Sequence, residues 1–375
     1  MPTKAQAELI NKHIGSCRFI YNLALETKLM AYKGNKINIG CFDLIKQLPD
    51  LKKECVWLKE INAQSLQQSI RYLDDAFAKF FKGQTDFPNF KKKNSKQSFN
   101  ISEDINIDFE NNKLKINKFR EGINIILHRS FNGIIKQVTI NKSSTGKYFT
   151  SILVENNIAI PVKVNIESYN TIGIDLGIKS FLVTSDGQKI DNPKCLKNNI
   201  SRLKWTQSKY SKYEGKKAKH KLTILHEKIA NQRLDFLNKI STQLIKNHNS
   251  IAIENLNING LMQNHKFAQS ICDAGWGMFV EMLKYKAEWQ GKNILQIGRF
   301  EPSSKTCNLC GTINKELTLK DREWTCNSCN TIHDRDHNAA INIKKIALKN
   351  KLCMECIQEN QNELLTLVGV LTSET

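Results

Sequence analysis

The sequence has no long hydrophobic run. No window approaches the ~18 uncharged apolar residues of a membrane-spanning helix, and the opening MPTKAQAELINKHIG lacks the basic and then apolar order of a signal peptide. Proline is scarce, at 6 of 375 residues, and a content of 40% hydrophobic and 25% charged residues excludes collagen-like, low-complexity and wholly disordered chains. We therefore expect a cytoplasmic globular protein of roughly two or three domains, with no membrane partner.

Acidic residues are few relative to basic ones. The 36 Asp and Glu against 56 Lys and Arg leave a net charge of +20, which favours a polyanionic partner over a small acidic substrate. Residues 191–250 hold 14 Lys and Arg against 4 Asp and Glu, half of that excess. A charged helix is often only a solvated face. Charge this concentrated favours a helical hairpin that faces nucleic acid, with candidate contacts at Lys216, Lys217, Lys219 and Lys221.

Hydrophobic periodicity changes along the chain. Apolar residues recur at helical spacing over residues 6–81, and a loop rich in Gly, Pro and Lys follows. Over residues 98–155, short alternating runs separated by NN, NG and STG turns predict an antiparallel meander or a small barrel. After Thr171, apolar strands alternate with helices, which indicates an α/β sheet. The predicted fold class is therefore multidomain, α+β and α/β.

Two acidic residues lie in strands whose sequence predicts burial. Asp175 lies in the apolar run TIGIDLGI, where an unpaired carboxylate costs several kcal/mol. Glu254 ends a second such run, SIAIE. One acidic residue at a strand end can simply bond a nearby loop amide. Two independent cases predict a shared site at the carboxyl ends of the strands.

A third acidic residue is expected beside them. In IHDRDHNAAINIKKIA, the helix core stripe runs through Ala340, Ile343 and Ala347, and Asp336 lies on the same face in the first turn. Asp334 precedes it as the expected N-cap. Three converging carboxylates repel one another unless divalent cations lie between them. Such oxygen-only sites suit Mg²⁺ or Mn²⁺, and two-metal sites hydrolyse phosphodiesters.

Four of the eleven cysteines form a metal-binding pattern. Cys307, Cys310, Cys326 and Cys329 give two CxxC pairs separated by fifteen residues, the spacing of a structural zinc ribbon. Four thiolates leave no open position, so this Zn²⁺ would be structural and not catalytic. Cys353 and Cys356 form a further CxxC on a predicted helix, where they read as plain helix residues.

These motifs, in this order, resemble TnpB, the transposon-encoded, OrfB-like ancestor of type V CRISPR effectors. The resemblance rests on GIDLG with Asp175, IENL with Glu254, the CxxC pairs and DRDHNAAINI with Asp336. It extends to PTKAQ, GSCRFIYN, SLQQSIRYLDDAFAKFF, FPNFKKKNSKQSF and HEKIANQRLDFLNKIS, and so covers nearly the whole chain.

The resemblance implies a domain layout and an activity. It implies a helical recognition domain, a wedge β-barrel, an RNase H-like RuvC nuclease domain and an inserted zinc ribbon that binds the target. The expected ranges are 1–95 for the helical domain, 96–165 for the wedge, 166–300 for the first RuvC part with its basic hairpin at 191–250, 301–331 for the ribbon, 332–347 for the second RuvC part and 348–375 for a tail. The implied activity is guide-RNA-directed cleavage of double-stranded DNA beside a short transposon-adjacent motif, by a monomer whose guide is transcribed from the transposon end.

Two alternatives remain open from the sequence. One is a guided DNA-binding regulator, which would be expected to lack the acidic triad; here all three carboxylates are present. The other is a zinc-ribbon DNA-binding or transposition accessory protein, which leaves the buried acids without a role. The family also usually has a basic strand before its PTxxQ segment, whereas here Met1 abuts Pro2. The resemblance thus implies either an upstream start or a wedge that lacks its first strand.

Recognition of the adjacent motif is assigned to one helix and one loop. Reading base edges requires amide or cationic donors on a rigid element, and Gln64, Gln67 and Gln68 lie on the helix before the basic loop. Phosphate contacts are expected from Lys91, Lys92, Lys93 and Lys96, which position a duplex without reading it.

Overall fold

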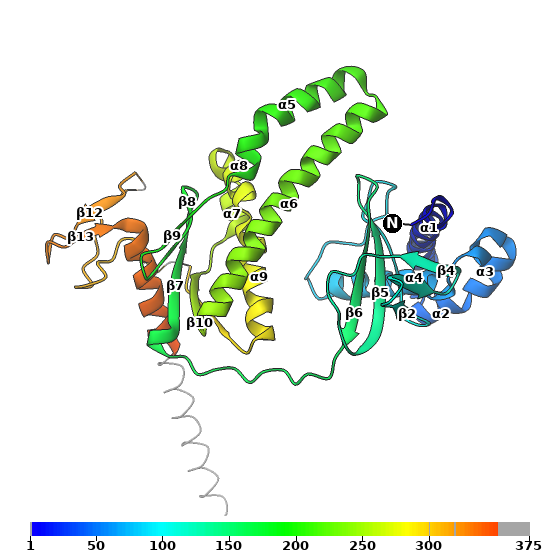
Figure 1. Cartoon of the computed structure of the whole chain (residues 1–375), viewed down its shortest axis with the longest axis horizontal. Coiled ribbons are helices and arrows are strands. Elements are labelled where there is room, and N and C mark those ends of the chain that lie inside the picture. Colours follow the sequence, from blue (N-terminus) through cyan, green and yellow to red (C-terminus); the bar gives the residue numbers. More distant parts are fainter. Residues whose placement is uncertain (1, 300, 319, 352–375) are drawn as a thin grey trace, which may run out of the picture. The chain divides into compact units, whose positions relative to one another are not determined.

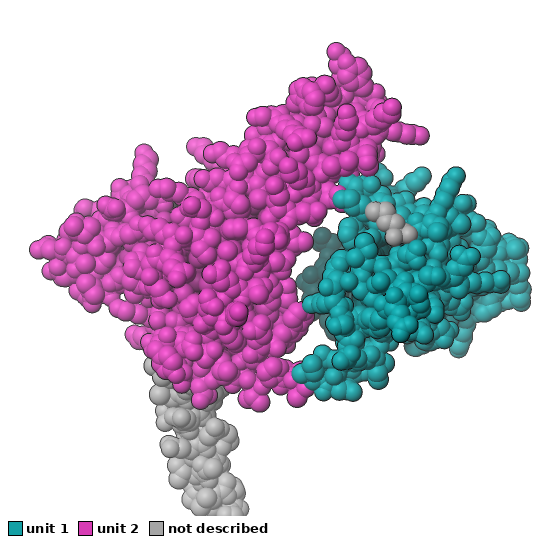
Figure 2. Space-filling view, in the orientation of Figure 1, with its two compact units in different colours: residues 1–158 teal, residues 159–375 magenta. Residues whose placement is uncertain are grey.

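The computed structural model describes residues 2–299, 301–318 and 320–351, and the chain divides into two compact units (Figure 2). Unit 1 is Met1–Ile158 and unit 2 is Ala159–Thr375. Cys353, Cys356 and most of the expected tail lie outside the described residues. No helix among the described residues is both long and apolar enough to cross a membrane.

The first part of unit 1 is helical, as the periodicity predicted. Thr3 and Gln6 form a capping box at the start of the first helix, and the Asn62 side chain caps the last one by accepting from the backbone of Gln64 and Ser65. The elements are α1 (Lys4–Asn35), α2 (Cys41–Lys46), α3 (Leu48–Glu54), the 3₁₀ helix η1 (Val56–Glu60) and α4 (Ala63–Phe81).

The strands of unit 1 form two three-stranded antiparallel sheets. One has the order β1-β5-β6 and the other the order β2-β3-β4. The strands are β1 (Gln97–Ile101), β2 (Asn106–Asp108), β3 (Lys113–Ile116), β4 (Phe119–Asn124), β5 (Ile134–Lys142) and β6 (Tyr148–Glu155). The meander was predicted; a closed barrel stays a prediction.

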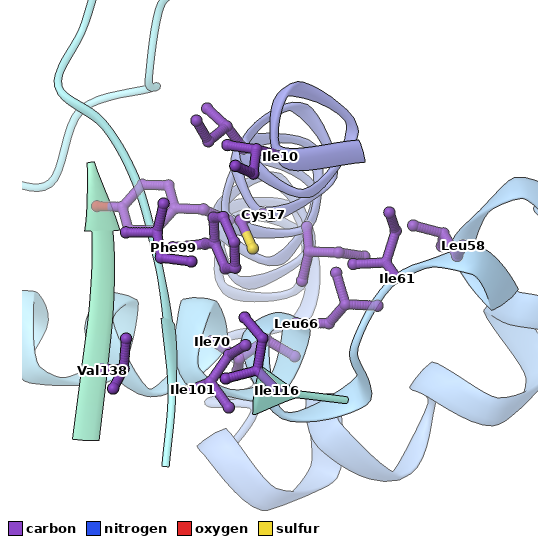
Figure 3. Packing of buried hydrophobic residues seen from close by; sticks show 14 of the residues in the cluster. Ile10, Cys17, Leu58, Ile61, Leu66, Ile70, Phe99, Ile101, Ile116 and Val138 are labelled. Carbon is purple, nitrogen blue, oxygen red and sulfur yellow. The ribbon is translucent and has the colours of Figure 1, made fainter. Parts of the chain in front are cut away.

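The helices and strands of unit 1 share one hydrophobic core. Ile10 of α1 and Leu66 and Ile70 of α4 pack with Ile101 and Val138 of the first sheet (Figure 3). The sequence placed a domain boundary at residues 95/96. In the structure, residues on both sides of this position belong to one unit. Periodicity shows which face of a helix or strand is apolar, but it does not show which other element packs against that face.

His13 links α1 to the start of α4 inside this core. Its Nε2 accepts from the Asn62 backbone N–H at 3.1 Å, so Nδ1 carries the proton and donates to the Leu9 carbonyl at 2.9 Å. The ring also packs against Phe99 and Phe119, with centroids 4.9 and 5.3 Å away. Burial, with a smaller contribution from the charge of Lys118, lowers the pKa of His13 to about 4.

We expect unit 1 to lose stability as the pH falls from about 6.5 to about 4. The unfolded chain binds a proton at His13 near its ordinary pKa of 6.5, whereas the folded chain resists protonation until about 4. The difference is worth about 3 kcal/mol once the pH is below both values. Urea unfolding of wild type and His13→Gln across this range measures it. An equal pH slope in both proteins would contradict the assignment.

Unit 2 is built on a five-stranded mixed sheet with the order β11-β10-β7-β8-β9. β7 runs parallel to β10 and antiparallel to β8; β10 and β11 are parallel. The strands are β7 (Thr171–Leu176), β8 (Ser180–Thr184), β9 (Lys189–Asp191), β10 (Ser250–Glu254) and β11 (Asn293–Ile297). The 3₁₀ helix η2 (Ser168–Asn170) precedes them. The α/β pattern that the sequence predicted after Thr171 is present.

Helices cover both faces of this sheet. Ile172, Ile174 and Ile251 pack with helices α6 and α9 on one face, and Ala252 packs with Ile343 of the last described helix on the other. The helices are α5 (Cys195–Tyr213), α6 (Lys216–Asn247), α7 (Ile258–Met262), α8 (His265–Ala274), α9 (Trp276–Trp289) and the helix over residues 335–351. α5 and α6 form a hairpin that extends beyond the sheet (Figure 1).

Gly173 sets the distance between β7 and the helix over residues 335–351. A Cβ at Gly173 would lie 2.1 Å from the Ala340 carbonyl oxygen and 2.8 Å from the Lys344 Cβ. No side chain fits there without moving the helix. The first glycine of the GIDLG motif therefore serves close packing of helix on strand.

The insert between β11 and the last helix is small and largely irregular. Its regular part is a two-stranded antiparallel sheet of β12 (Glu323–Thr325) and β13 (Ile332–Asp334). Cys307, Leu317, Trp324 and Cys326 form its own small core. A core of four residues is too small to hold a fold of this size alone.

Candidate functional site

Asp175 and Glu254 lie side by side at one edge of the unit 2 sheet. Ile253 pairs with Ile174 in the parallel register, so Glu254 and Asp175 are the next residues along their strands. Side chains alternate between the faces of a strand. Since Ile174 packs against α6 and α9, Asp175 faces the other side, which the helix over residues 335–351 covers.

The environment of these carboxyl groups disfavours their charged form. Burial, followed by the negative charges of Asp336 and Glu254, raises the pKa of Asp175 to about 8. Burial also raises the pKa of Glu254. Asp175 therefore needs a proton or a nearby cation at neutral pH, which is the electrostatic condition of a metal site.

Asp336 is the third carboxylate at this edge, and two guanidinium groups hold it. Arg335 donates to Oδ1 from Nη2 at 2.8 Å and from Nε at 3.1 Å, and Arg322 of the insert donates to Oδ2 at 3.2 Å. No pattern in the sequence indicates Arg322, because its partner is 14 residues away along an irregular segment. Both carboxylate oxygens of Asp336 thus accept hydrogen bonds from positively charged guanidinium groups.

Asp334 has a different function. Its Oδ1 accepts from the His337 backbone at 3.0 Å, which confirms the predicted N-cap, and its Oδ2 pairs with Lys189 at 2.6 Å. Burial opposes ionisation, but the bonds from Lys189 and His337 prevail and lower the pKa of Asp334. The helix therefore begins at Arg335, directly after this cap, as the predicted N-cap requires.

The spacing of the three carboxylates bears on the kind of metal site they fit. Among the described residues, the cysteines are the group of potential ligands whose atoms all lie within 4.8 Å of one another. The negative charges of Asp336 and Glu254 act on Asp175, and the three carboxylates are not among the groups of described residues whose ligand atoms all lie within 4.8 Å of one another. Two ions about 4 Å apart need a wider ligand set, and an oxygen-only set fits Mg²⁺ or Mn²⁺.

The four predicted cysteines do converge. Cys307 and Cys329 have their sulfur atoms 3.6 Å apart, and Cys310 and Cys326 3.5 Å apart. A disulfide would bring two sulfurs to about 2.05 Å, whereas a tetrahedral zinc with Zn–S bonds of about 2.3 Å spaces them at about 3.8 Å. The cluster is therefore compatible with a zinc ribbon.

Residues that the sequence did not single out join this cluster to the helix bearing Asp336. The buried side chain of Asn338 donates to the Thr306 carbonyl at 2.8 Å and accepts from the Asn308 backbone at 2.9 Å. Asn342, also buried, donates to the carbonyls of Ser303 at 2.8 Å and Thr306 at 2.6 Å. We call this pair the asparagine clamp. It fixes the first CxxC loop on the helix.

His333 adds a second link between the two sites. Its Nε2 lies 3.1 Å from the Cys307 sulfur, and its ring packs on Trp324 with centroids 4.7 Å apart. It directly precedes the Asp334 cap. Outer partners of this kind orient metal ligands.

The predicted nucleic-acid residues differ in their surroundings. Lys216, Lys217, Lys219 and Lys221 are all exposed at the start of α6, as are Lys92, Lys93 and Lys96 in the loop of unit 1. Lys91 is half-buried, with its ammonium 3.7 Å from the Tyr21 ring centroid, and burial lowers its pKa. Lys91 therefore packs against unit 1, unlike the other three loop lysines.

The three glutamines of α4 are not equivalent either. Gln64 is bonded to Glu103 through its Nε2 and accepts from the Glu103 backbone at 3.1 Å. Gln68 lines a cavity of about 60 Å³ that Arg18, Lys92 and Lys96 also line. Gln67 lies beside it on α4 and is partly exposed. The structure thus places Gln68, but not Gln64, among the basic side chains.

Comparison with known proteins identifies the family. A protein of Streptomyces pristinaespiralis named "Putative RNA-guided DNA endonuclease" is 35% identical over 375 residues, covering 97% of this chain and 92% of that protein. The chain belongs to the TnpB family. A similarly named Escherichia coli relative, InsQ, is 28% identical to this TnpB chain, over 94% of the chain and 92% of the relative.

Family models and a solved structure agree with this assignment. Residues 152–265 match a probable transposase model and residues 276–343 a Cas12f1-like TNB domain. Residues 1–36 match a helix-turn-helix model, although this chain has one continuous helix over most of that range. A Cas12f1–sgRNA–target DNA complex superposes with a TM-score of 0.55 at 16% identity, covering 91% of this chain and 83% of that one, which shows a shared fold.

Proposed function

We propose that this TnpB protein is an RNA-guided endonuclease that cleaves double-stranded DNA beside a short transposon-adjacent motif by metal-assisted phosphodiester hydrolysis. The observation that carries the proposal is the placement of Asp175, Glu254 and Asp336 at one sheet edge, where burial and mutual repulsion raise the pKa of Asp175 to about 8. The names of its relatives support the same activity.

In this proposal each carboxylate holds divalent metal. When bound, Mg²⁺ or Mn²⁺ would activate a water and stabilise the leaving oxygen. Asp175 must release its proton to become a ligand, so cations and protons compete for it below about pH 8. Asp336 must exchange hydrogen bonds from Arg322 and Arg335 for the metal. Lys189 neutralises Asp334, so this residue is left as a cap.

The proposed layout follows from the units. The five-stranded mixed sheet supports an RNase H-like RuvC domain, the cysteine cluster supports a target-binding zinc ribbon, and unit 1 supplies a helical recognition region and a wedge. The partners would be a guide RNA from the transposon end and the target DNA. We propose that the protein acts as a monomer in the cytoplasm.

Incubating the purified protein with its copurified RNA, Mg²⁺ and a plasmid bearing a guide-matched target tests this function. Cleavage of that plasmid, and none of an unmatched one, is the expected result. Guided binding without cleavage would instead favour a regulator, and binding that ignores the guide would favour a transposition accessory protein. The presence of all three carboxylates argues against both.

Neutralising four lysines at the start of α6 should weaken nucleic-acid binding about equally for all sequences. Each phosphate contact contributes roughly 0.7 to 0.9 to the slope of log K against log salt, so up to about three units of slope would be lost. The variant replaces Lys216, Lys217, Lys219 and Lys221 with Gln, and titration at several salt concentrations measures the slope. An unchanged slope would mean that these four lysines form only a solvated helix face and do not contact phosphates.

Changing Gln68 to Ala should alter which flanking sequences are cut. Gln68 lies among cationic side chains that can hold a duplex, whereas Gln64 is bonded to Glu103. We expect a smaller change for Gln64→Ala, and a uniform loss for all targets when Lys92, Lys93 and Lys96 are removed. A library with randomised flanks measures the preference. An identical preference in wild type and a Gln64, Gln67, Gln68 triple Ala variant would exclude these residues.

A further inference from the structure

The hairpin of α5 and α6 contains a groove that is lined by aromatic as well as basic side chains. The cavity between the two helices has a volume of about 440 Å³. Trp205, Lys209 and Tyr213 line it from α5, spaced four residues apart and so on one helix face. Lys217, Lys221 and Lys228 line it from α6. Both helices thus present basic side chains to the same space.

The two aromatic side chains are unusually exposed for their size. Trp205 is 60% exposed and Tyr213 is 67% exposed. The Lys209 ammonium lies 3.8 Å from the Trp205 ring centroid, a cation–π contact that holds the indole beside positive charge. Neither ring belongs to the small core of the hairpin, which is built on Cys195, Leu225 and Ile229. Lys212 lies 5.6 Å from the Tyr213 ring centroid in the same way. Each ring thus carries a lysine near it, and its remaining exposed surface is available to a ligand.

The charge of the groove restricts the ligand. Arg202 adds a further cation, and the lining residues include neither Asp nor Glu. A ligand that covers this surface must offer both negative charge and flat apolar rings. Single-stranded nucleic acid has both, because its phosphates pair with Lys and Arg while its unpaired bases stack on aromatic rings.

We propose that this groove, which we call the hairpin groove, binds unpaired bases of single-stranded RNA by stacking on Trp205 and Tyr213. The proposal rests on the function proposed above and names the part of the RNA that the hairpin holds. Duplex alone does not fit, since its bases are already stacked on each other. The four lysines named from the sequence divide accordingly: Lys217 and Lys221 line the groove, while Lys216 and Lys219 do not.

The position of the groove favours RNA over the DNA strand that is cut. Lys217 is 20 residues before Leu237, which packs in the sheet core, so the groove lies about 30 Å along α6 from that core at ~1.5 Å per residue. DNA must reach the carboxylates to be cleaved. A bound strand that is never cut is better held away from them.

The test compares a Trp205→Ala, Tyr213→Ala double variant with wild type for binding of a mixed-sequence single-stranded RNA, measured by anisotropy at several salt concentrations. We expect binding weaker by about 10-fold to 100-fold, with an unchanged salt slope because no charge is removed. Trp205→Phe combined with Tyr213→Phe should restore most of the affinity. The matched control is Trp289→Ala, since Trp289 is 71% exposed on α9 of the same unit, outside the groove.

The nature of the probe separates the remaining explanations. An RNA of the same length with abasic sites should bind wild type and the double variant alike. Equal RNA affinity of wild type and the double variant, an equal loss in Trp289→Ala, or a loss confined to single-stranded DNA or to an acidic peptide would each overturn the proposal. These measurements need no cleavage, so a groove that fails leaves the nuclease proposal intact, and an inactive nuclease leaves the groove testable.

Discussion

Replacing Asp175 or Asp336 with Asn, or Glu254 with Gln, is expected to lower DNA cleavage by ~10³-fold or more, because each change removes a ligand whose metal supplies several kcal/mol of transition-state stabilisation. Binding of guide RNA and target should survive, since the carboxylates hold metal and not the duplex. Cleavage rates and affinities, measured on the same preparations, check both statements.

Asp334→Asn is the matched control for these variants. Asn is as good an N-cap as Asp, so the helix over residues 335–351 should keep its start while the charge beside Lys189 is lost. We expect activity within a few fold of wild type. An inactive Asp334→Asn together with an active Asp336→Asn would mean that the two residues have exchanged roles.

Removing one of the four cysteine thiolates should unfold the insert. Zinc binding by four thiolates contributes roughly 10 to 16 kcal/mol in small ribbons, far more than the core of Leu317 and Trp324 can replace. We expect one zinc per chain in wild type, and loss of the zinc with rapid proteolysis between residues 301 and 334 in Cys326→Ser. Elemental analysis and limited proteolysis measure these two effects.

Cys272→Ser is the control, because Cys272 is exposed and lies outside the cluster. It should keep its zinc and its resistance to protease. The Cys326→Ser variant should also cleave DNA poorly, since Arg322 and the asparagine clamp connect the insert to the helix of Asp336. Freshly purified wild type without zinc would refute the ribbon.

The sequence predicted those features that depend on local pattern. Apolar runs located β7 and β10, and parallel pairing of buried strands then brought Asp175 and Glu254 together. The α5–α6 hairpin was predicted as well, over residues 191–250; in the structure it starts at Cys195 and turns at Glu214 with a φ of 45°. Gly215, the N-cap of α6, directly follows this turn and is its signal in the sequence.

Partners distant in the chain could not be predicted. Nothing in the spacing of Arg322 indicates that it bonds Asp336, and Asn338 and Asn342 look like ordinary polar positions on a helix until the CxxC loop is placed against them. Exposed aromatics gave no pattern either. Trp205 and Tyr213 stand out only once the second helix supplies the opposite wall of the groove.

The asparagine clamp has a consequence for engineering. Five hydrogen bonds join Asn338 and Asn342 to the backbone of residues 303–308, so the ribbon cannot be exchanged between relatives as an autonomous cassette. A chimera whose donor segment stops at residue 331 would place a foreign loop against these two side chains. One that carries residues 301–351 together keeps the matched surfaces, and Gly173 then decides whether the transplanted helix fits the recipient sheet.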